Sequence, residues 1–171
     1  MRNFFIATIA LMILSTNAFA QKETKLPSAN IKTLDGTTIN TRDLNNDGKP
    51  FVISFWATWC KPCKLELDNI AAVYPDWQEE LGVKLYAVSI DDSRSMRRVA
   101  PTVSGKGWEY EVLLDSNMDF KRAMNVVNVP HTFVVDGKGN IVYQHSGYTV
   151  GDEDELFEIL TKVAKGEKIK H

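Results

Sequence analysis

The feature that most constrains this chain is the pentapeptide at residues 59–63, Trp-Cys-Lys-Pro-Cys, which holds both of its cysteines. The apolar, β-branched and aromatic run at 51–57 is typical of a buried strand, and a helical pattern follows from Cys60 to about Leu81. Unpaired N–H groups and the positive dipole at a helix start favour a cysteine thiolate. A second cysteine one turn along can attack a mixed disulfide formed by the first. The motif therefore predicts a thiol–disulfide exchange site.

Residues 1–20 have the pattern of a secretory signal peptide. Arg2 precedes an apolar run from Phe4 to Leu14, and small residues occupy the two positions that a signal peptidase inspects. An N-terminal membrane anchor is the alternative, although the run is short and has no charged flank. We expect cleavage near Ala20 and a periplasmic or otherwise extracytoplasmic location.

A structural disulfide is the alternative role for the two cysteines, because secreted proteins commonly use them in this way. A bridge across so short a loop constrains the unfolded chain little, so the spacing favours a redox pair. Composition is that of an ordered globular protein, with 44% hydrophobic and 25% charged residues, and residues 21–171 are long enough for one domain with its own core. The net charge is −2 and no basic cluster is present, so nucleic acid is not an expected partner.

Strand and helix patterns alternate along the chain, and two hairpins flank them. Alternation of this kind predicts an α/β three-layer sandwich with a mixed central sheet, in which the cysteines lie at the C-terminal end of a central strand. The expected elements are a hairpin at 31–39, a strand at 51–57, a helix at 60–81 kinked or divided by Pro75, a strand at 83–90, a helix over part of 93–104 shortened or bent by Pro101, a strand at 108–114, a helix at 117–124 capped by Ser116 or Asn117, a hairpin at 132–144 and a helix at 152–164.

Glu66 is the acidic residue that lies within the apolar face of the predicted 60–81 helix. It follows Cys63 by three residues and so projects beside it. A partly desolvated acid there can take or give the proton of a cysteine. The alternative is a boundary carboxylate that reaches out to solvent.

The chain resembles the thioredoxin superfamily and, more narrowly, the TlpA/ResA-type extracytoplasmic thiol–disulfide oxidoreductases of bacteria. The likeness runs from about residue 26 to 165. It rests on Phe-Trp-Ala-Thr-Trp-Cys-Lys-Pro-Cys-Lys-x-Glu at 55–66, Val-Pro-His-Thr-Phe at 129–133 and Asp-Gly-Lys-Gly at 136–139.

The resemblance implies a role for each matching position. Cys60 would be the attacking nucleophile, Cys63 the resolving thiol and Glu66 the acid of the TlpA/ResA group. Pro130 would be a cis-proline beside the disulfide, and Val129 would offer backbone hydrogen bonds to a substrate peptide. Trp59 is expected at the surface, where it can line a substrate groove.

The chain departs from the family pattern at several positions. Cytoplasmic thioredoxins carry a buried Asp six residues before the first cysteine, where this chain has Ser54. Asp68 replaces a Pro of the family, which can alter the first helical turns. The segment 92–114 resembles the central insertion of the subfamily.

Three further residues are candidates for tuning the reactivity of Cys60. Lys61 and Pro62 lie between the cysteines, and a lysine at a helix start can favour a nearby thiolate or simply be solvated. His131 stands where the family more often has Thr. If it faces the cysteines, its charge favours the Cys60 thiolate below neutral pH; otherwise it is a solvent-facing loop residue.

The leading functional hypothesis is a reductase of disulfides in other extracytoplasmic proteins, with no cofactor. The resemblance implies cytochrome c maturation or general thiol reduction as the setting, with a membrane-embedded thiol electron donor as a second partner. A monomer is expected. The same cysteines can run in reverse as an oxidase or isomerase, because the reduction potential sets the direction.

Two other functions are less well supported. A peroxiredoxin-like nucleophile needs a Thr and a Pro at positions that are Ala57 and Ile53 here. A copper chaperone would use Cys60, Cys63 and His131, but copper carriers of this fold space their cysteines by three residues. No spacing of His and Cys typical of a metal site is present.

Overall fold

The computed structural model describes residues 24–169, which form a mixed eight-stranded sheet in the order β1-β8-β7-β4-β5-β6-β2-β3. The strands are β1 (Thr24–Lys25), β2 (Asn30–Thr33), β3 (Thr38–Asn40), β4 (Phe51–Trp56), β5 (Lys84–Ser89), β6 (Glu111–Leu114), β7 (His131–Val135) and β8 (Asn140–Ser146). The helices are α1 (Lys61–Leu81), α2 (Val99–Lys106), α3 (Asp119–Ala123) and α4 (Asp152–Ala164), with short 3₁₀ turns η1 (Thr41–Asp43) and η2 (Met96–Arg98). The predicted signal peptide, residues 1–20, lies outside the described residues.

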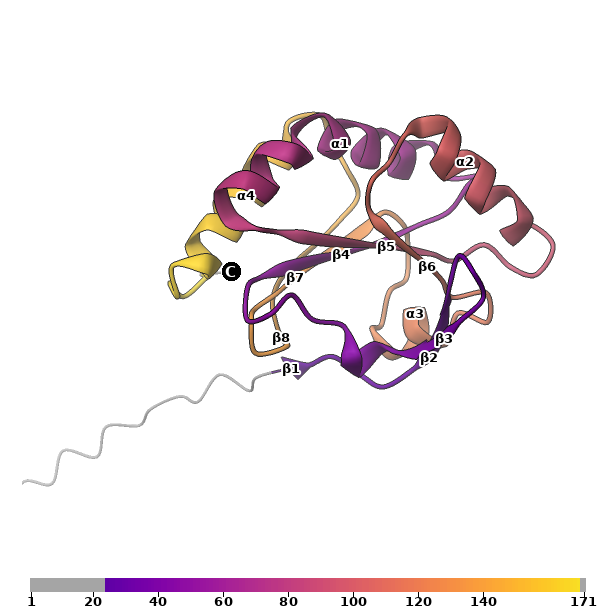
Figure 1. Ribbon diagram of the computed structural model, residues 1–171, viewed down its shortest axis with the longest axis horizontal. Coiled ribbons are helices and arrows are strands. Elements are labelled where there is room, and N and C mark those ends of the chain that lie inside the picture. Colours follow the sequence, from indigo (N-terminus) through magenta and orange to yellow (C-terminus); the bar gives the residue numbers. More distant parts are fainter. Residues whose placement is uncertain (1–23, 170–171) are drawn as a thin grey trace, which may run out of the picture.

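The helices cover both faces of the sheet. Helices α1, α2 and α4 lie on one face and α3 lies on the other, as Figure 1 shows. Strands β4, β5 and β6 are parallel, whereas β7, β8, β1, β2 and β3 pair antiparallel with their neighbours. The three-layer α/β sandwich with a mixed sheet is therefore confirmed. No helix among residues 24–169 combines the length and apolar character needed to span a bilayer.

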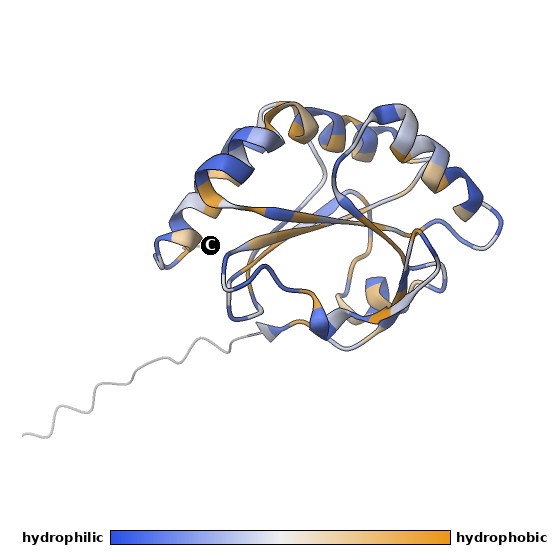
Figure 2. Cartoon of the chain, in the orientation of Figure 1, coloured by the Kyte–Doolittle hydropathy of each residue, from blue (hydrophilic) through white to orange (hydrophobic). Residues whose placement is uncertain are grey.

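The core is centred on β4, which is buried along its whole length between β5 and β7. The ring of Phe55 lies between those of Phe120 and Phe133, with centroids 5.2 and 6.0 Å away. The ring of Trp56 packs edge-to-face against that of Trp108, with centroids 5.0 Å apart. Hydrophobic residues concentrate in these central strands (Figure 2). Each buried side chain of this size contributes roughly 1.5–3 kcal/mol, which makes β4 a firm support for the segment that follows it.

Helix α1 is not divided at Pro75, so of the two predicted outcomes, a kink or a division, the division is wrong. Proline removes one backbone hydrogen bond from a helix and crowds the preceding turn. Pro75 lies on the exposed side of α1, where water can reach the carbonyl that loses its partner. The opposite face, which includes Tyr74 and Trp77, is buried and holds the helix on the sheet.

The segment between β5 and β6 also differs from its prediction in detail. The helical part begins as η2 and continues as α2 to Lys106, two residues beyond the expected end. Pro101 lies in the first turn of α2, where a missing N–H costs little. Strand β6 begins at Glu111, so Trp108 and Tyr110 are buried side chains of the preceding loop and not strand residues.

The predicted cap of α3 was wrong. The N-cap position is Met118, and no side chain of Ser116 or Asn117 caps the helix. Instead the carboxylate of Asp115 accepts hydrogen bonds from the N–H groups of Phe120 (3.2 Å) and Lys121 (2.8 Å). Asp115 directly follows β6, so it ties α3 to the sheet.

Candidate functional site

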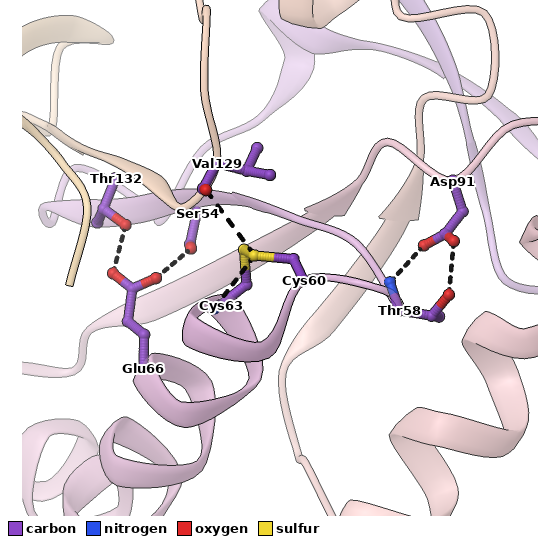
Figure 3. Close-up of a disulfide and its surroundings, with 8 residues drawn as sticks. All are labelled: Ser54, Thr58, Cys60, Cys63, Glu66, Asp91, Val129 and Thr132. Atoms are coloured by element: carbon purple, nitrogen blue, oxygen red, sulfur yellow. Dashed lines mark hydrogen bonds between the residues drawn. A yellow bond between two sulfur atoms is a disulfide. The ribbon is translucent and has the colours of Figure 1, made fainter.

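Cys60 and Cys63 form a disulfide at the start of α1, directly after the C-terminal end of β4. Their Cα atoms are 5.4 Å apart (Figure 3). Cys60 is 5% exposed and Cys63 is fully buried. A reagent or substrate that approaches from solvent therefore meets the sulfur of Cys60 first.

Cys60 is the N-cap residue of α1, and its side chain does the capping. Its extended backbone conformation, at φ −86° and ψ 104°, lets Sγ accept a hydrogen bond from the N–H of Cys63 at 3.3 Å. Pro62 lies in the first turn of the helix, where no backbone donor is needed. The sulfur thus lies at the positive end of the helix dipole, beside a backbone donor, and both favour a thiolate on Cys60 once the disulfide is reduced.

The loop that carries Cys60 is anchored to the end of β5. The carboxylate of Asp91 accepts hydrogen bonds from the N–H of Thr58 (2.8 Å) and from its hydroxyl (2.6 Å), as Figure 3 shows. Ser89 donates to the same carboxylate at 2.9 Å, and Asp91 is buried. This anchor fixes the turn between β4 and α1, so the position of the first sulfur does not depend on the helix alone.

The segment before β7 lies against the disulfide, although it is some seventy residues away in sequence. The Val129–Pro130 peptide bond is cis, and the carbonyl oxygen of Val129 lies 3.8 Å from Sγ of Cys60. Pro130 is buried, and its carbonyl accepts a hydrogen bond from Gly147 at 2.9 Å. Val129 is half-buried, so its backbone borders both the sulfur and the surface.

Glu66 is 1% exposed, so its carboxylate does not reach solvent. Ser54 of β4 donates to Oε2 at 3.2 Å, and Thr132 of β7 donates to Oε1 at 2.6 Å (Figure 3). A buried carboxylate is costly unless such donors satisfy it. Cys63 lies three residues earlier on α1, so the two buried side chains share one face of the helix.

His145 is the residue of this cluster that sequence reasoning missed. Its Nε2 lies 3.5 Å from Oε1 of Glu66. His145 is the antiparallel partner of Thr132 in the β7–β8 hairpin, and side chains of paired strand residues point to the same face. The sequence predicts the hairpin but not which residues of its two strands are paired. That register shifts between Val134 and Val135, and it decides that His145 lies opposite Thr132.

His131 lies on the other side of β7 from Thr132, because successive strand residues alternate between faces. Its ring stacks on Phe133, with centroids 4.5 Å apart, and its Nε2 lies 3.1 Å from Oε1 of Gln144. Partial burial lowers the pKa of His131, so the ring is mostly neutral near pH 7. The structure thus brings His145, and not His131, to the carboxylate beside Cys63.

The surface around Cys60 is part apolar and part cationic. Trp59 is 61% exposed, and Lys61 is also exposed. A groove of about 330 Å³ opens beside Trp59 and is lined by apolar Met118, basic Arg98 and acidic Asp92.

Asp68, which replaces a proline of the family pattern, has a structural role. Its carboxylate accepts hydrogen bonds from Lys106 (2.5 Å) and from the indole N–H of Trp108 (3.0 Å). It therefore joins α1 to the segment between β5 and β6. Among the described residues no group of three or more His, Cys, Asp or Glu side chains is arranged to hold a metal ion.

A mixed sheet covered by helices, a Cys-x-x-Cys pair at the start of a helix and a cis-proline beside it together define a thioredoxin-like fold with a redox disulfide. Comparison with known families places residues 23–144 in the AhpC/TSA family, and the chain belongs to that family.

Relatives with known names agree with this class. ResA, a thiol-disulfide oxidoreductase of Bacillus thuringiensis, is 31% identical over 134 residues, which cover 75% of each chain. The sporulation thiol-disulfide oxidoreductase A of Bacillus subtilis is 28% identical over 145 residues, 80% of this chain and 86% of that one. The solution structure of a thioredoxin-like protein from Porphyromonas gingivalis is 53% identical and superposes with a TM-score of 0.75, covering 85% of this chain and 95% of that one.

Proposed function

We propose that this protein is a thiol–disulfide oxidoreductase that reduces disulfides of extracytoplasmic proteins. The observation that carries the proposal is the disulfide between Cys60 and Cys63, with the outer sulfur at a helix N-terminus and 3.8 Å from the Val129 carbonyl. Two relatives named as thiol-disulfide oxidoreductases support it.

The reaction consists of two exchanges. In the reduced protein the Cys60 thiolate attacks one sulfur of a substrate disulfide, a mixed disulfide forms, and one substrate thiolate leaves. Glu66 takes the proton of the Cys63 thiol, and the Cys63 thiolate then attacks Sγ of Cys60 and releases the second substrate thiolate. Two electrons pass to the substrate, and the cysteines end as the disulfide seen here.

Substrate binding is assigned to the residues that border Cys60. Trp59 supplies an exposed aromatic surface, and the backbone of Val129, held by the cis-proline Pro130, offers hydrogen bonds to an extended substrate segment. Lys61 and Pro62 lie between the sulfurs, exposed to solvent, and complete the edge that a substrate meets.

The predicted signal peptide at residues 1–20 supports a location outside the cytoplasm. A reductase outside the cytoplasm must be returned to its dithiol form by a donor, and we propose a membrane-embedded thiol protein for this role. Cytochrome c maturation is the proposed pathway, with general thiol reduction as the broader one. The protein would act as a monomer without a cofactor.

Replacement of each cysteine tests the exchange mechanism. Cys60→Ser should abolish disulfide reduction, because the nucleophile is lost. Cys63→Ser should accumulate a covalent adduct through Cys60, because resolution is lost. The measurement is turnover of an insulin disulfide together with intact mass after an acid quench. Normal turnover by the Cys63 variant would contradict the mechanism.

The direction of exchange is tested by the reduction potential of the Cys60–Cys63 couple in a defined thiol buffer. A potential well below that of glutathione is expected for a reductase, and a potential near that of a strong oxidant would reassign the protein as an oxidase or isomerase.

Peroxide reduction is disfavoured because Ala57 and Ile53 occupy the positions where a peroxiredoxin-like site needs Thr and Pro. Consumption of hydrogen peroxide by the reduced protein at a rate above its disulfide exchange would reverse that judgement.

A further inference from the structure

The carboxylate of Glu66 has no direct route to water. It is 1% exposed and is enclosed by Ser54, Thr132 and His145. A base that takes the Cys63 proton must pass it on, either back to Cys63 when the disulfide is next reduced or out to water. The two hydroxyl groups already donate their protons to this carboxylate, so release to water needs another group.

His145 is the group that meets this requirement. Its Nε2 is buried, lies 3.5 Å from Oε1 of Glu66 and has no hydrogen bond within the described part of the chain. The side chain as a whole is 19% exposed and lines a cavity of about 1100 Å³ along β8. One edge of the imidazole thus faces the carboxylate while another part of the side chain reaches the surface.

The tyrosines around Glu66 and His145 keep one protonation state near neutral pH. Burial raises the pKa of Tyr110, of Tyr143 and of Tyr148, the last to about 12, so all three stay neutral. The pKa of His131 on β7 is lowered by burial.

Two carboxylates of α4 accept hydrogen bonds from tyrosines near Glu66 and His145. Tyr148 donates to Glu153 at 2.5 Å and Tyr143 donates to Glu155 at 3.3 Å. Neither carboxylate has a hydrogen bond or ion pair to His145 among the described residues. An imidazole, in contrast, has two ring nitrogens and can accept a proton on one and release a proton from the other, which suits a relay.

We propose that His145 is a positioning residue that relays protons between Glu66 and solvent during resolution of the mixed disulfide. The inference rests on the proposed exchange function and assigns its proton route. When the Cys63 thiol gives its proton to Glu66, that proton moves to Nε2 of His145, and the imidazolium releases a proton to water. The electron transfer is unchanged: the S–S bond to the substrate breaks and the Cys60–Cys63 bond forms.

The test separates the two exchanges. The reduced protein is mixed with oxidised glutathione and quenched with acid at intervals, and its intact mass is measured by mass spectrometry. The rate at which the glutathione adduct on Cys60 forms and the rate at which it disappears are then followed separately across a range of pH. His145→Ala should form the adduct at the wild-type rate and resolve it about tenfold more slowly near neutral pH, less than the about hundredfold typical of a direct acid–base residue.

Added imidazole should restore the resolution rate of His145→Ala, because the substitution leaves space for the small base beside Glu66. His145→Gln, which fills that space without a titrating group, should be equally slow and should not respond to imidazole. Glu158→Gln, a substitution on the exposed face of α4, is the control and should behave as wild type, with or without imidazole.

Wild-type resolution rates and pH profile in both His145 variants would overturn the relay. So would a folded His145→Ala variant, checked by circular dichroism, whose slow resolution imidazole does not relieve. If His145→Ala does not fold, the pH profile of His145→Gln decides. A wild-type protein that forms no adduct would instead refute the proposed function, so the two failures are distinguishable.

Discussion

Ser54 and Glu66 together occupy the buried space beneath the cysteines. The resemblance to thioredoxins places an Asp at the position of Ser54, and here the serine hydroxyl donates instead to a carboxylate that comes from α1. The acid is thus carried by the same helix that carries Cys63, three residues away. A change of helix position would move the thiol and its base together, which keeps their geometry constant.

Replacing Glu66 by Gln tests the role of this acid. The amide has nearly the same size but cannot take a proton, so resolution of the Cys60 adduct should slow about a hundredfold, with adduct formation little changed. The measurement is the acid-quenched mass assay, with Glu158→Gln on the exposed face of α4 as control. Equal resolution rates in the Glu66 variant and wild type would remove Glu66 from the mechanism.

At the scale of elements, the turn between β7 and β8 packs closely against the loop before β4. A Cβ built on Gly137 would lie 1.9 Å from the carbonyl oxygen of Gly48, which is closer than any real contact. The Asp136–Gly139 turn is otherwise held by hydrogen bonds from Lys138 and Asn140 to the carboxylate of Asp136. The need for glycine at 137 is therefore a tertiary one.

Gly137→Ala should lower the free energy of unfolding by about 1–3 kcal/mol, because the backbone of one loop must move. Gly105→Ala is a suitable control: it lies within α2, nothing lies within 4 Å of the added carbon, and it should be neutral or stabilise the protein by about 0.5–1 kcal/mol. Urea unfolding of both variants measures the difference. Equal stability of the two variants would show that the close approach is not maintained in solution.

At the scale of the whole molecule, buried carboxylates couple stability to pH. Asp115 is 2% exposed at the junction of β6 and α3, and burial raises its pKa above the usual value. The folded state therefore binds a proton on Asp115 more readily than the unfolded state does. The resulting stabilisation is full below the unfolded pKa and is lost as pH rises through the folded pKa.

Asp115→Asn should remove this pH dependence, because the amide oxygen can still accept a backbone N–H but does not titrate. Relative to wild type, the variant should become more stable as pH is raised from about 4 to about 7. Urea unfolding at the two pH values measures this difference, and Asp76→Asn on the exposed face of α1 is the control. A stability difference that stays constant or moves the other way would show that Asp115 is not the group responsible.

Much of this molecule was predictable because local patterns agree with the fold. Helix α4 has its predicted bounds, and both hairpins lie at their predicted turns. The prediction was wrong where tertiary packing outweighs a local rule: Pro75 does not divide α1, because the buried face of the helix is held on the sheet. Asp115 replaces Ser116 and Asn117 at the start of α3 because the chain leaves β6 in an orientation that points this carboxylate at the helix.

The sequence by itself determined the position of the two cysteines at the start of a helix, and it placed Glu66 within the apolar face of that helix, since both follow from helical periodicity within a few residues. Only the tertiary structure decided which histidine meets that acid. His131 and His145 lie on adjacent strands, and the register of β7 with β8 turns the second toward Glu66 and the first away from it. Register depends on side-chain packing and turn geometry across the whole sheet, so no local pattern could have chosen between them.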